Sequence, residues 1–217
     1  MVVNPHDLVR IREGTELTMC PDIPSWVTTS LQSTPFVVVR RVPVIEGRIP
    51  IGVRGKQRNQ RFGAYIRQED VLDHISPSQI VDEGKWMENT RNSPMPAFQA
   101  LRQVNDILHS YGMVWGPGGS VGFEIVSGRD TVTENSDLDI VVYAEDGLPI
   151  EKAETLVARL SDIPIVVDVQ VETPNGAISL REYARNEYPV LIKTTGGPKL
   201  VDNPWEKSHH KRSLWIK

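Results

Sequence analysis

Hydrophobic positions in the second half of the chain follow two different periods. Over residues 97–111, apolar side chains such as Phe98, Leu101 and Val104 recur close to the 3.6-residue period of an amphipathic helix. Gly112 follows, at a position where such helices commonly end. Beyond this helix, short apolar runs alternate with helical patterns, which predicts an α/β or α+β domain built on a small mixed sheet.

Four short strands and two further helices are expected in this half. The strands are predicted at residues 113–116, 138–143, 165–171 and 190–193. The helices are predicted at residues 150–161 and 178–186.

The first part of the chain is richer in β-branched residues and glycine. The run FVVVRRVPV at residues 36–44 predicts a strand, which Pro43 should end or confine to a sheet edge. Residues 72–86 are predicted to form a helix, with Ser76 and Pro77 marking its start or a break.

Together these patterns predict an α+β protein in three segments. Residues 1–86 should form a small, β-rich, basic domain. Residues 87–96, rich in Asn, Ser and Pro, should form a linker. Residues 97–217 should form a catalytic domain with a small mixed sheet and flanking helices.

The composition is that of an ordinary globular protein. Of 217 residues, 39% are apolar and 24% are charged. No apolar run approaches the ~20 residues that cross a bilayer, and the N-terminus lacks the pattern of a secretory signal peptide, so no membrane partner is expected. The single cysteine, Cys20, cannot form an intrachain disulfide, and we therefore expect a reducing, cytoplasmic location.

The net charge of -4 is distributed unevenly. Residues 40–67 contain eight Lys or Arg residues against one acid, Glu46, which gives this segment a net charge of +7. Such a segment attracts polyanions, and nucleic acid, a phosphorylated small molecule and an acidic protein are all candidates. A solvated loop face is an equal alternative on charge alone.

Two aspartates, Asp137 and Asp139, stand at the start of the second predicted strand. The two-residue period of a strand puts both carboxylates on one face and Leu138 and Ile140 on the other. Carboxylates this close repel each other unless a cation joins them, and hard oxygen ligands suit Mg²⁺ or Mn²⁺. A turn or strand cap at Ser136 is the alternative, but it explains only one of the two acids.

A third aspartate, Asp168, lies between Val167 and Val169. A charge in such an apolar run is expensive to bury unless it is paired or bound to a metal. We therefore predict Asp168 as the third catalytic carboxylate and metal ligand. Gln170 and Glu172 share its face of the strand, so they compete for this assignment.

A glycine turn precedes these acids. Gly118, Gly119 and Ser120 follow the first short strand, and their backbone N–H groups and the Ser120 hydroxyl are suited to bind a phosphate. The Gly-Lys-Ser/Thr of a phosphate-binding loop is absent, and the glycine spacing differs from the dinucleotide fingerprint. We predict these three residues as part of a substrate site.

The order of these parts resembles the nucleotidyltransferase superfamily, which has the DNA polymerase β-like fold. A Gly-Ser turn is followed by Asp-x-Asp on one strand and a single Asp on a later strand. In that superfamily the carboxylates hold two divalent ions, one activating the attacking hydroxyl and the other neutralising the leaving diphosphate. The gap between Ser120 and Asp137 is longer than is usual there, so the resemblance does not fix the geometry of residues 121–134.

Longer stretches extend the resemblance over nearly the whole chain. The chain closely resembles malonate decarboxylase holo-acyl carrier protein synthases in PHDLVRI, VVVRR, IPIGVRGKQRNQRFGAY, WGPGGSVGFE, SDLDIVV, VDVQVETPNGAISLREYAR and LIKTTGGPKLV, in the expected order. One departure is Gly118, where the family pattern has Thr before the Gly-Ser pair.

Members of that family are phosphoribosyl-dephospho-CoA transferases. The resemblance implies transfer of the prosthetic group from 2′-(5″-triphosphoribosyl)-3′-dephospho-CoA to a serine of the apo acyl carrier protein of malonate decarboxylase, with release of diphosphate. It also implies that Asp137 and Asp139 are the essential acidic pair and that Mg²⁺ or Mn²⁺ is required. Carrier proteins are usually acidic, which suits the basic segment and makes nucleic acid the less favoured partner.

Four basic residues complete the predicted site. Arg54, Arg58 and Arg61 are expected to contact the donor or the carrier protein, because arginine binds phosphate through paired hydrogen bonds. Lys193, at a predicted strand end, is expected to reach the leaving phosphates. Surface charge and a solvated strand end are the respective alternatives. For Asp7, which follows a histidine, a turn or cap role is expected.

Two other functions stay open at this point. One is a nucleotidyltransferase acting on another hydroxyl acceptor, which would be a nucleic acid, a small molecule or a different protein. The other is a catalytically inactive module that only binds the carrier protein. The combination of three aspartates with the Gly-Ser turn argues against the inactive module.

Overall fold

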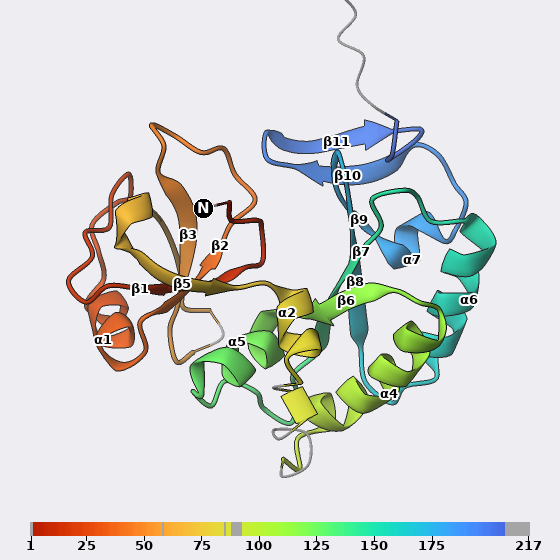
Figure 1. The fold of residues 1–217 in the computed structure, drawn as a ribbon, viewed down its shortest axis with the longest axis horizontal. Coiled ribbons are helices and arrows are strands. Elements are labelled where there is room, and N and C mark those ends of the chain that lie inside the picture. Colours follow the sequence, from red (N-terminus) through yellow and green to blue (C-terminus); the bar gives the residue numbers. More distant parts are fainter. Residues whose placement is uncertain (1, 58, 85, 88–92, 207–217) are drawn as a thin grey trace, which may run out of the picture.

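The chain folds into two lobes, each built on one β-sheet (Figure 1). The structure is a computed structural model and describes residues 2–57, 59–84, 86–87 and 93–206. The expected α+β architecture, with a β-rich first part, is confirmed. Among the described residues, no helix is both long and apolar enough to span a bilayer.

The first lobe is a five-stranded antiparallel sheet with one helix on it. In spatial order its strands are β4 (Arg61–Ile66), β3 (Ile49–Arg54), β2 (Phe36–Val39), β1 (Leu8–Ile11) and β5 (Val71–Ile75). A short 3-10 helix, η1 (Gln68–Asp70), joins β4 to β5. Helix α1 (Ser25–Ser33) covers one face, where Val37, Ile51 and Ala64 are fully buried. The other face carries smaller and charged residues and looks toward the second lobe.

The second lobe is a six-stranded mixed sheet with helices on both sides of it (Figure 1). In spatial order its strands are β11 (Gly197–Val201), β10 (Val190–Thr194), β9 (Gly176–Ser179), β8 (Val167–Thr173), β7 (Leu138–Tyr143) and β6 (Val114–Pro117). Its helices are α2 (Pro77–Asp82), α4 (Pro96–Ser110), α5 (Gly119–Ser127), α6 (Ile150–Ser161) and α7 (Leu180–Tyr183). Only β7 and β8 pair in parallel, and α6 supplies the crossover that such a pair requires.

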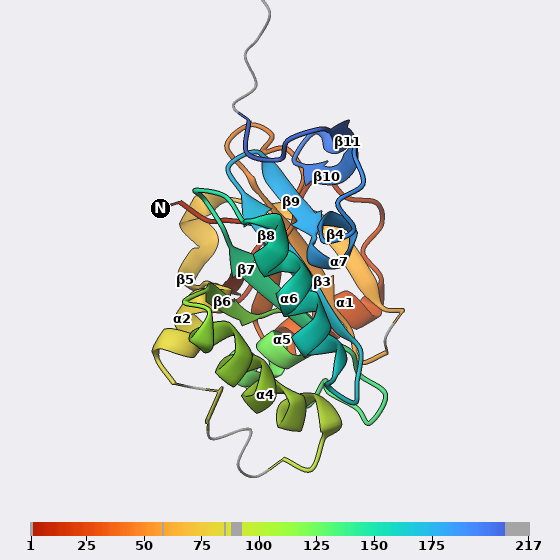
Figure 2. The same cartoon turned by 90° about the vertical axis from the view of Figure 1, so that its right-hand side faces the viewer.

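The main hydrophobic core lies between this sheet and its helices. Phe98 and Leu101 of α4 and Leu156 of α6 are fully buried against Leu138 and Ile140 of β7. Figure 2 shows α4 and α6 together on the outer side of the sheet. Because strand side chains alternate, the residues of β7 between these leucine and isoleucine positions must point away from α4 and α6, toward the first lobe.

The helix predicted at residues 97–111 is confirmed as α4, with Gly112 in the left-handed region at φ 60. The strand at residues 138–143 and the helix at residues 150–161 are confirmed as β7 and α6. The strands at residues 113–116, 165–171 and 190–193 are confirmed with ends shifted by one or two residues.

Two predicted helices are wrong in part. Of residues 72–86, the first four belong to β5, which pairs with β1, and the helix α2 begins only at Pro77. Ser76 starts it with a capping box that includes Gln79, which is the start signal noted in the sequence. The helix predicted at residues 178–186 is limited to the single turn of α7, because its first two residues pair within the sheet as β9.

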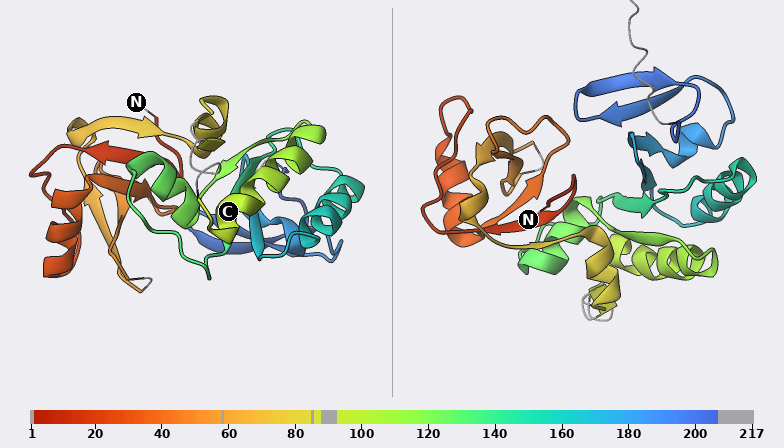
Figure 3. Two further views of the ribbon diagram at one scale, coloured as in Figure 1. Left: turned by 90° about the horizontal axis from the view of Figure 1, so that it is seen from below. Right: turned by 45° about the horizontal axis from the view of Figure 1, so that its top comes forward.

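The strand predicted at residues 36–44 ends at Val39, before Pro43. The predicted segment boundaries stay a prediction, and residues 88–92 of the predicted linker lie outside the described residues. The chain passes from the first lobe to the second through β5 and α2, and α2 packs against β6 (Figure 3).

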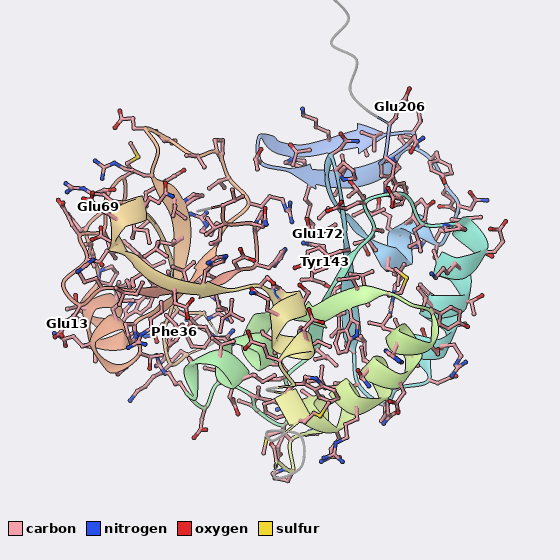
Figure 4. The ribbon with its side chains drawn as sticks, viewed as in Figure 1. Glu13, Phe36, Glu69, Tyr143, Glu172 and Glu206 are labelled. Atoms are coloured by element: carbon pink, nitrogen blue, oxygen red, sulfur yellow. The ribbon has the colours of Figure 1, made fainter. Side chains whose placement is uncertain are left out.

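A polar cluster joins the two lobes. Arg41, just after β2, forms an ion pair with Glu172 of β8, and both side chains are largely buried. His6 Nε2 lies 3.5 Å from Glu172 Oε1 and 2.5 Å from Gln170 Nε2. Figure 4 shows Glu172 between the lobes. These contacts hold one sheet at a fixed distance from the other.

The expected turn role of Asp7 is confirmed beside this cluster. Its Oδ2 atom accepts a hydrogen bond of 2.8 Å from the backbone N–H of Asn4, and the side chain is buried. The turn orients the preceding residue, His6, which adopts a left-handed φ of 76. Asp7 is therefore a structural residue that places His6 at the lobe contact.

We predict that replacing Glu172 by Gln weakens the contact between the lobes. The variant keeps the size of the side chain but removes the charge that Arg41 meets, so the free energy of unfolding at neutral pH should fall by about 1.5–3 kcal/mol. Burial works to raise the pKa of Glu172, but the hydrogen bond with His6 and the charge of Arg41 outweigh it, and the net effect lowers this pKa.

A lowered carboxyl pKa stabilises the fold above the unfolded-state pKa, and this contribution is lost as the pH falls through the folded-state pKa. The stability difference between wild type and Glu172→Gln should therefore shrink below about pH 4. Urea denaturation at a series of pH values measures it. A difference that stays constant down to the acid end of the series would contradict this role for the ion pair.

Candidate active site

A cleft of about 830 Å³ lies between the two sheets, and the start of helix α5 forms part of its lining. The predicted site residues that line it are Arg54, Arg61, Gly118, Gly119, Ser120, Asp137, Asp139 and Asp168. Lys193 does not line it, and Arg58 lies outside the described residues. The structure therefore brings most of the predicted residues to one place, from both lobes.

The three aspartates share one face of the second sheet. Asp137 immediately precedes β7, Asp139 is the second residue of that strand, and Asp168 is its direct partner in the parallel pairing with β8. Leu138 and Val167 point to the opposite, buried side. Burial, followed by the charges of Asp137 and Asp168, raises the pKa of Asp139, so these two carboxylates lie close enough to oppose the ionisation of Asp139.

The expectation that Asp168 is buried among its apolar neighbours is wrong. The side chain is exposed in the cleft, because strand alternation directs Val167 and Val169 into the core and Asp168 out of it. An exposed carboxylate remains solvated, so Asp168 needs neither an ion pair nor a metal to be stable in this position. What favours a role for Asp168 is its position beside Asp139, and its assignment as a third ligand stays a prediction.

The glycine turn lies against the Asp139 carboxylate. The backbone N–H of Gly118 donates to the backbone carbonyl of Asp139 over 2.9 Å. Gly119 begins α5 with a left-handed φ of 53, and a Cβ there would stand 1.8 Å from Asp139 Oδ2. Only a glycine fits this approach. The first-turn N–H groups of α5 have no acceptor within the helix, so this end of α5 attracts anions.

The long gap between Ser120 and Asp137 is filled by α5 and a loop fixed upon it. Glu124 Oε2 accepts hydrogen bonds of 2.7 Å from the backbone N–H groups of both Thr131 and Val132. Thr131 Oγ1 donates to the Ser120 carbonyl over 2.9 Å. The loop therefore returns the chain to Asp137 over the start of the helix, an arrangement that the sequence did not indicate.

Arg54 faces the aspartates from the first lobe. It is half-buried at the end of β3, and it pairs across the strands with Arg61 at the start of β4. Burial, followed by the charge of Arg61, lowers the pKa of Arg54 to about 10, and the charges of Asp139 and Asp137 partly oppose this. Within the described residues its guanidinium group has no hydrogen bond or ion pair. A half-buried cation that makes no hydrogen bond to the described part of the chain favours an anionic ligand in the cleft.

The basic segment does not form one patch. Arg40, Arg54, Lys56 and Arg61 line the cleft. Three other described members lie outside it: Arg41 pairs with Glu172, Arg48 donates to Thr18, and Arg67 contacts Glu16 and Glu69. Of these three only Arg67 is exposed, so the alternative of a solvated face describes a small part of the segment.

Lys193 is exposed on β10, and its Nζ donates to Gln170 Oε1 over 3.4 Å. His6, Arg40 and Gln170 also line the cleft; the sequence indicated Gln170 only as a competitor of Asp168 and did not assign His6 or Arg40 to the site. The alternation along β8 was a usable signal for Gln170, because that residue shares the face of Asp168. No local signal identified His6 or Arg40, since both reach the cleft through the packing of the lobes.

The donor set was tested against a divalent ion. Among the described residues, no group of three or more His, Cys, Asp and Glu side chains is arranged to hold a metal. Mg²⁺ is usually held by one or two carboxylates, with water and substrate phosphate as the remaining ligands. Asp137 and Asp139, beside a turn suited to phosphate, therefore fit an ion shared with a bound polyphosphate and do not fit a metal enclosed by protein ligands alone.

We predict that Gly119→Ala displaces the Asp139 carboxylate without unfolding the protein. The new Cβ would overlap Asp139 Oδ2, so the affinity for Mn²⁺ in the presence of inorganic tripolyphosphate should fall at least about tenfold, which corresponds to 1.4 kcal/mol. Calorimetric titration measures this affinity, and the thermal midpoint reports the fold.

Gly128→Ala is the matched control at the other end of α5. Gly128 also has a left-handed φ, 68, but a Cβ there would meet no atom within 4 Å. The control should carry a similar backbone strain and bind Mn²⁺ normally. Equal Mn²⁺ affinity in both variants would show that the Gly119–Asp139 contact does not matter for cation binding.

Comparisons with known proteins were made for the whole chain. Residues 4–77 match the family described as "Phosphoribosyl-dephospho-CoA transferase MdcG N-terminal domain", and residues 85–204 match "Phosphoribosyl-dephospho-CoA transferase MdcG C-terminal domain". No solved structure matches the chain.

Several curated proteins named phosphoribosyl-dephospho-CoA transferase are similar over almost their full length. The protein of Pseudomonas putida is 38% identical over 202 residues, which cover 93% of this chain and 94% of the relative. That of Pseudomonas syringae pv. tomato is 37% identical over 205 residues, 94% of each chain. That of Pseudomonas aeruginosa is 32% identical over 206 residues, 93% of each chain.

Proposed function

Because this chain belongs to the phosphoribosyl-dephospho-CoA transferase family, we propose that it transfers a dephospho-CoA prosthetic group to a carrier protein. The donor is 2′-(5″-triphosphoribosyl)-3′-dephospho-CoA, and the acceptor is a serine of the apo acyl carrier protein of malonate decarboxylase. The observation that carries the proposal is the cleft, in which the aspartates and the glycine turn of one lobe face the half-buried Arg54 of the other.

The reaction is an in-line displacement at phosphorus. The serine oxygen bonds to the α-phosphorus of the donor triphosphate, and the bond from that phosphorus to the bridging oxygen of diphosphate breaks. The serine proton passes to a base, and diphosphate leaves with the electron pair. The nucleophile comes from the partner protein, so the enzyme itself needs none, and its task is to position the substrates and stabilise charge.

The residues of the cleft divide these tasks. The first turn of α5, with Ser120, and the guanidinium group of Arg54 bind the triphosphate. Asp137 and Asp139 would hold Mg²⁺ or Mn²⁺, which lowers the pKa of a bound hydroxyl and offsets charge on the leaving diphosphate. Asp168 is exposed on the same face and is the candidate base for the serine proton.

The layout of the second lobe supports a nucleotidyltransferase fold of the polymerase β type. A Gly-Ser turn opens a helix, Asp-x-Asp opens the next strand, and the third Asp lies beside it on a parallel strand. The exposed Lys56 and Arg61 at the cleft suit an acidic carrier protein. We place the reaction in the cytoplasm, where the single Cys20 needs no partner.

The direct test is to incubate the protein with the donor, Mg²⁺ and the apo carrier protein and to follow the carrier by mass spectrometry. We expect a mass gain equal to the phosphoribosyl-dephospho-CoA group, located on one serine, and release of diphosphate. Labelling of RNA or of an unrelated protein by ATP, with the donor inert, would overturn the proposal in favour of another hydroxyl acceptor.

Asp168→Asn should separate proton transfer from binding. If Asp168 takes the serine proton, the variant should lose about 10²–10⁴-fold in the rate of transfer. Its affinity for tripolyphosphate with Mn²⁺ should stay close to the wild-type value. Asp139→Asn should lose both the transfer activity and this affinity. The matched control is Asp146→Asn, an exposed aspartate outside the cleft, which should change neither. Unaltered transfer by Asp168→Asn would remove Asp168 from the mechanism.

A further inference from the structure

A strip without large side chains crosses the cleft face of the first sheet. Gly52 of β3 and Gly63 of β4 are direct cross-strand partners, and Val38 of β2 is the partner of Gly52 on the other side. All three residues line the cleft. Over three adjacent strands, therefore, no side chain larger than valine rises from this part of the sheet.

The side chain of Arg40 lies along this strip. Its Cγ and Cδ atoms are each 3.6 Å from where a Cβ on Gly52 would stand. Its Nη1, Cζ and Nη2 atoms are 2.2, 2.8 and 3.4 Å from the corresponding point on Gly63. Because three atoms of the guanidinium group approach that one point together, the group lies with one face against the sheet, and the opposite face is turned to the cleft.

The backbone on both sides fixes this placement. The N–H group of Arg40 donates to the Pro50 carbonyl over 2.9 Å, and the next residue, Arg41, is held by Glu172 of the other lobe. In the described part of the chain, the guanidinium group of Arg40 has no hydrogen bond or ion pair. Arg40 is also exposed, so the cleft holds a positioned, planar cation to which no described side chain is bonded.

The orientation of the guanidinium group indicates which kind of ligand it binds. Phosphate and carboxylate bind to the edge of the guanidinium group, through its N–H donors. Planar rings stack on its face, and nucleobases stack on arginine in this way. A guanidinium group that rests flat on two glycines offers its face to the cleft, so a planar ring is the ligand that fits it.

We propose that Arg40, supported by Gly52 and Gly63, is the platform on which the adenine ring of the donor stacks. This inference rests on the proposed function, which supplies a donor whose adenine is joined through riboses to the triphosphate. The distances agree with that order: Gly52 and Arg54 are two residues apart on β3, which is about 7 Å along the strand. The two linked riboses of the donor are long enough to span such a gap between a ring on the glycine strip and phosphates at Arg54.

The test compares a ligand that carries adenine with one that does not. Wild type, Arg40→Ala, Arg40→Lys and Gly63→Ala are titrated calorimetrically with 3′-dephospho-CoA and, separately, with inorganic tripolyphosphate and Mg²⁺. We expect Arg40→Ala to bind 3′-dephospho-CoA at least about tenfold more weakly, given the usual strength of stacking on one base. Tripolyphosphate affinity and the thermal midpoint should stay at wild-type values.

The other two variants separate the face of the group from its charge. Arg40→Lys keeps the charge but has no planar face, so it should be as weak as Arg40→Ala. Gly63→Ala keeps the arginine but lifts it from the sheet, because the new Cβ would overlap Nη1, so it should also weaken 3′-dephospho-CoA. Arg67→Ala, an exposed arginine of the same lobe away from the cleft, is the control and should bind both ligands normally.

Several results would overturn the inference. Rescue by lysine, or loss of tripolyphosphate binding in Arg40→Ala, would make Arg40 a phosphate ligand. Wild-type affinity for 3′-dephospho-CoA in Arg40→Ala would end the stacking role while leaving the proposed transfer intact. A different result would separate the two proposals. If wild type binds ATP and Arg40→Ala does not, Arg40 does stack on adenine. If the same wild-type protein neither binds 3′-dephospho-CoA nor uses the donor, the proposed function is wrong.

Discussion

The parallel pairing of β7 with β8 is the constraint on which the site depends. It sets Asp139 directly beside Asp168, with Asp137 at the strand entrance, and so concentrates three carboxylates on one face of a sheet. The partial burial of Asp139 and the charges of its two neighbours oppose the ionisation of Asp139. The fold sustains the arrangement because Leu138, Ile140 and the crossover helix α6 anchor the opposite face in the main core. A slip of one residue would turn the carboxylates into that core.

The two lobes present side chains of opposite charge to the cleft between them. One presents the aspartates, and the other presents the half-buried Arg54 without a partner among the described residues. The ion pair of Arg41 with Glu172, together with His6, holds the lobes at the distance that leaves the cleft between them. A polyphosphate accompanied by a divalent ion balances both sides at once, since the ion suits the carboxylates and the phosphates suit the arginine and the start of α5.

The sequence predicted those parts of the fold whose signal is local. The amphipathic period of α4, the Asp-x-Asp strand β7 and the helix α6 were found because their own side chains determine them. Residues 72–75 were misassigned because pairing with β1, distant in sequence, makes them a strand. The carboxylate pair followed from strand alternation, and Asp168 was found from a premise that its exposure contradicts. Arg40 and His6 escaped notice because only the packing of the lobes brings them to the cleft.

The central claim is that Asp137 and Asp139 share a cation with the triphosphate of the donor, beside the glycine turn. A crystal structure with Mn²⁺ and the donor, in the absence of the carrier protein so that no transfer occurs, tests this most directly. We expect an anomalous Mn²⁺ signal at coordinating distance from both carboxylates and from the triphosphate, with the triphosphate between the first turn of α5 and Arg54. A triphosphate bound elsewhere, or an ion that neither Asp137 nor Asp139 contacts, would contradict it.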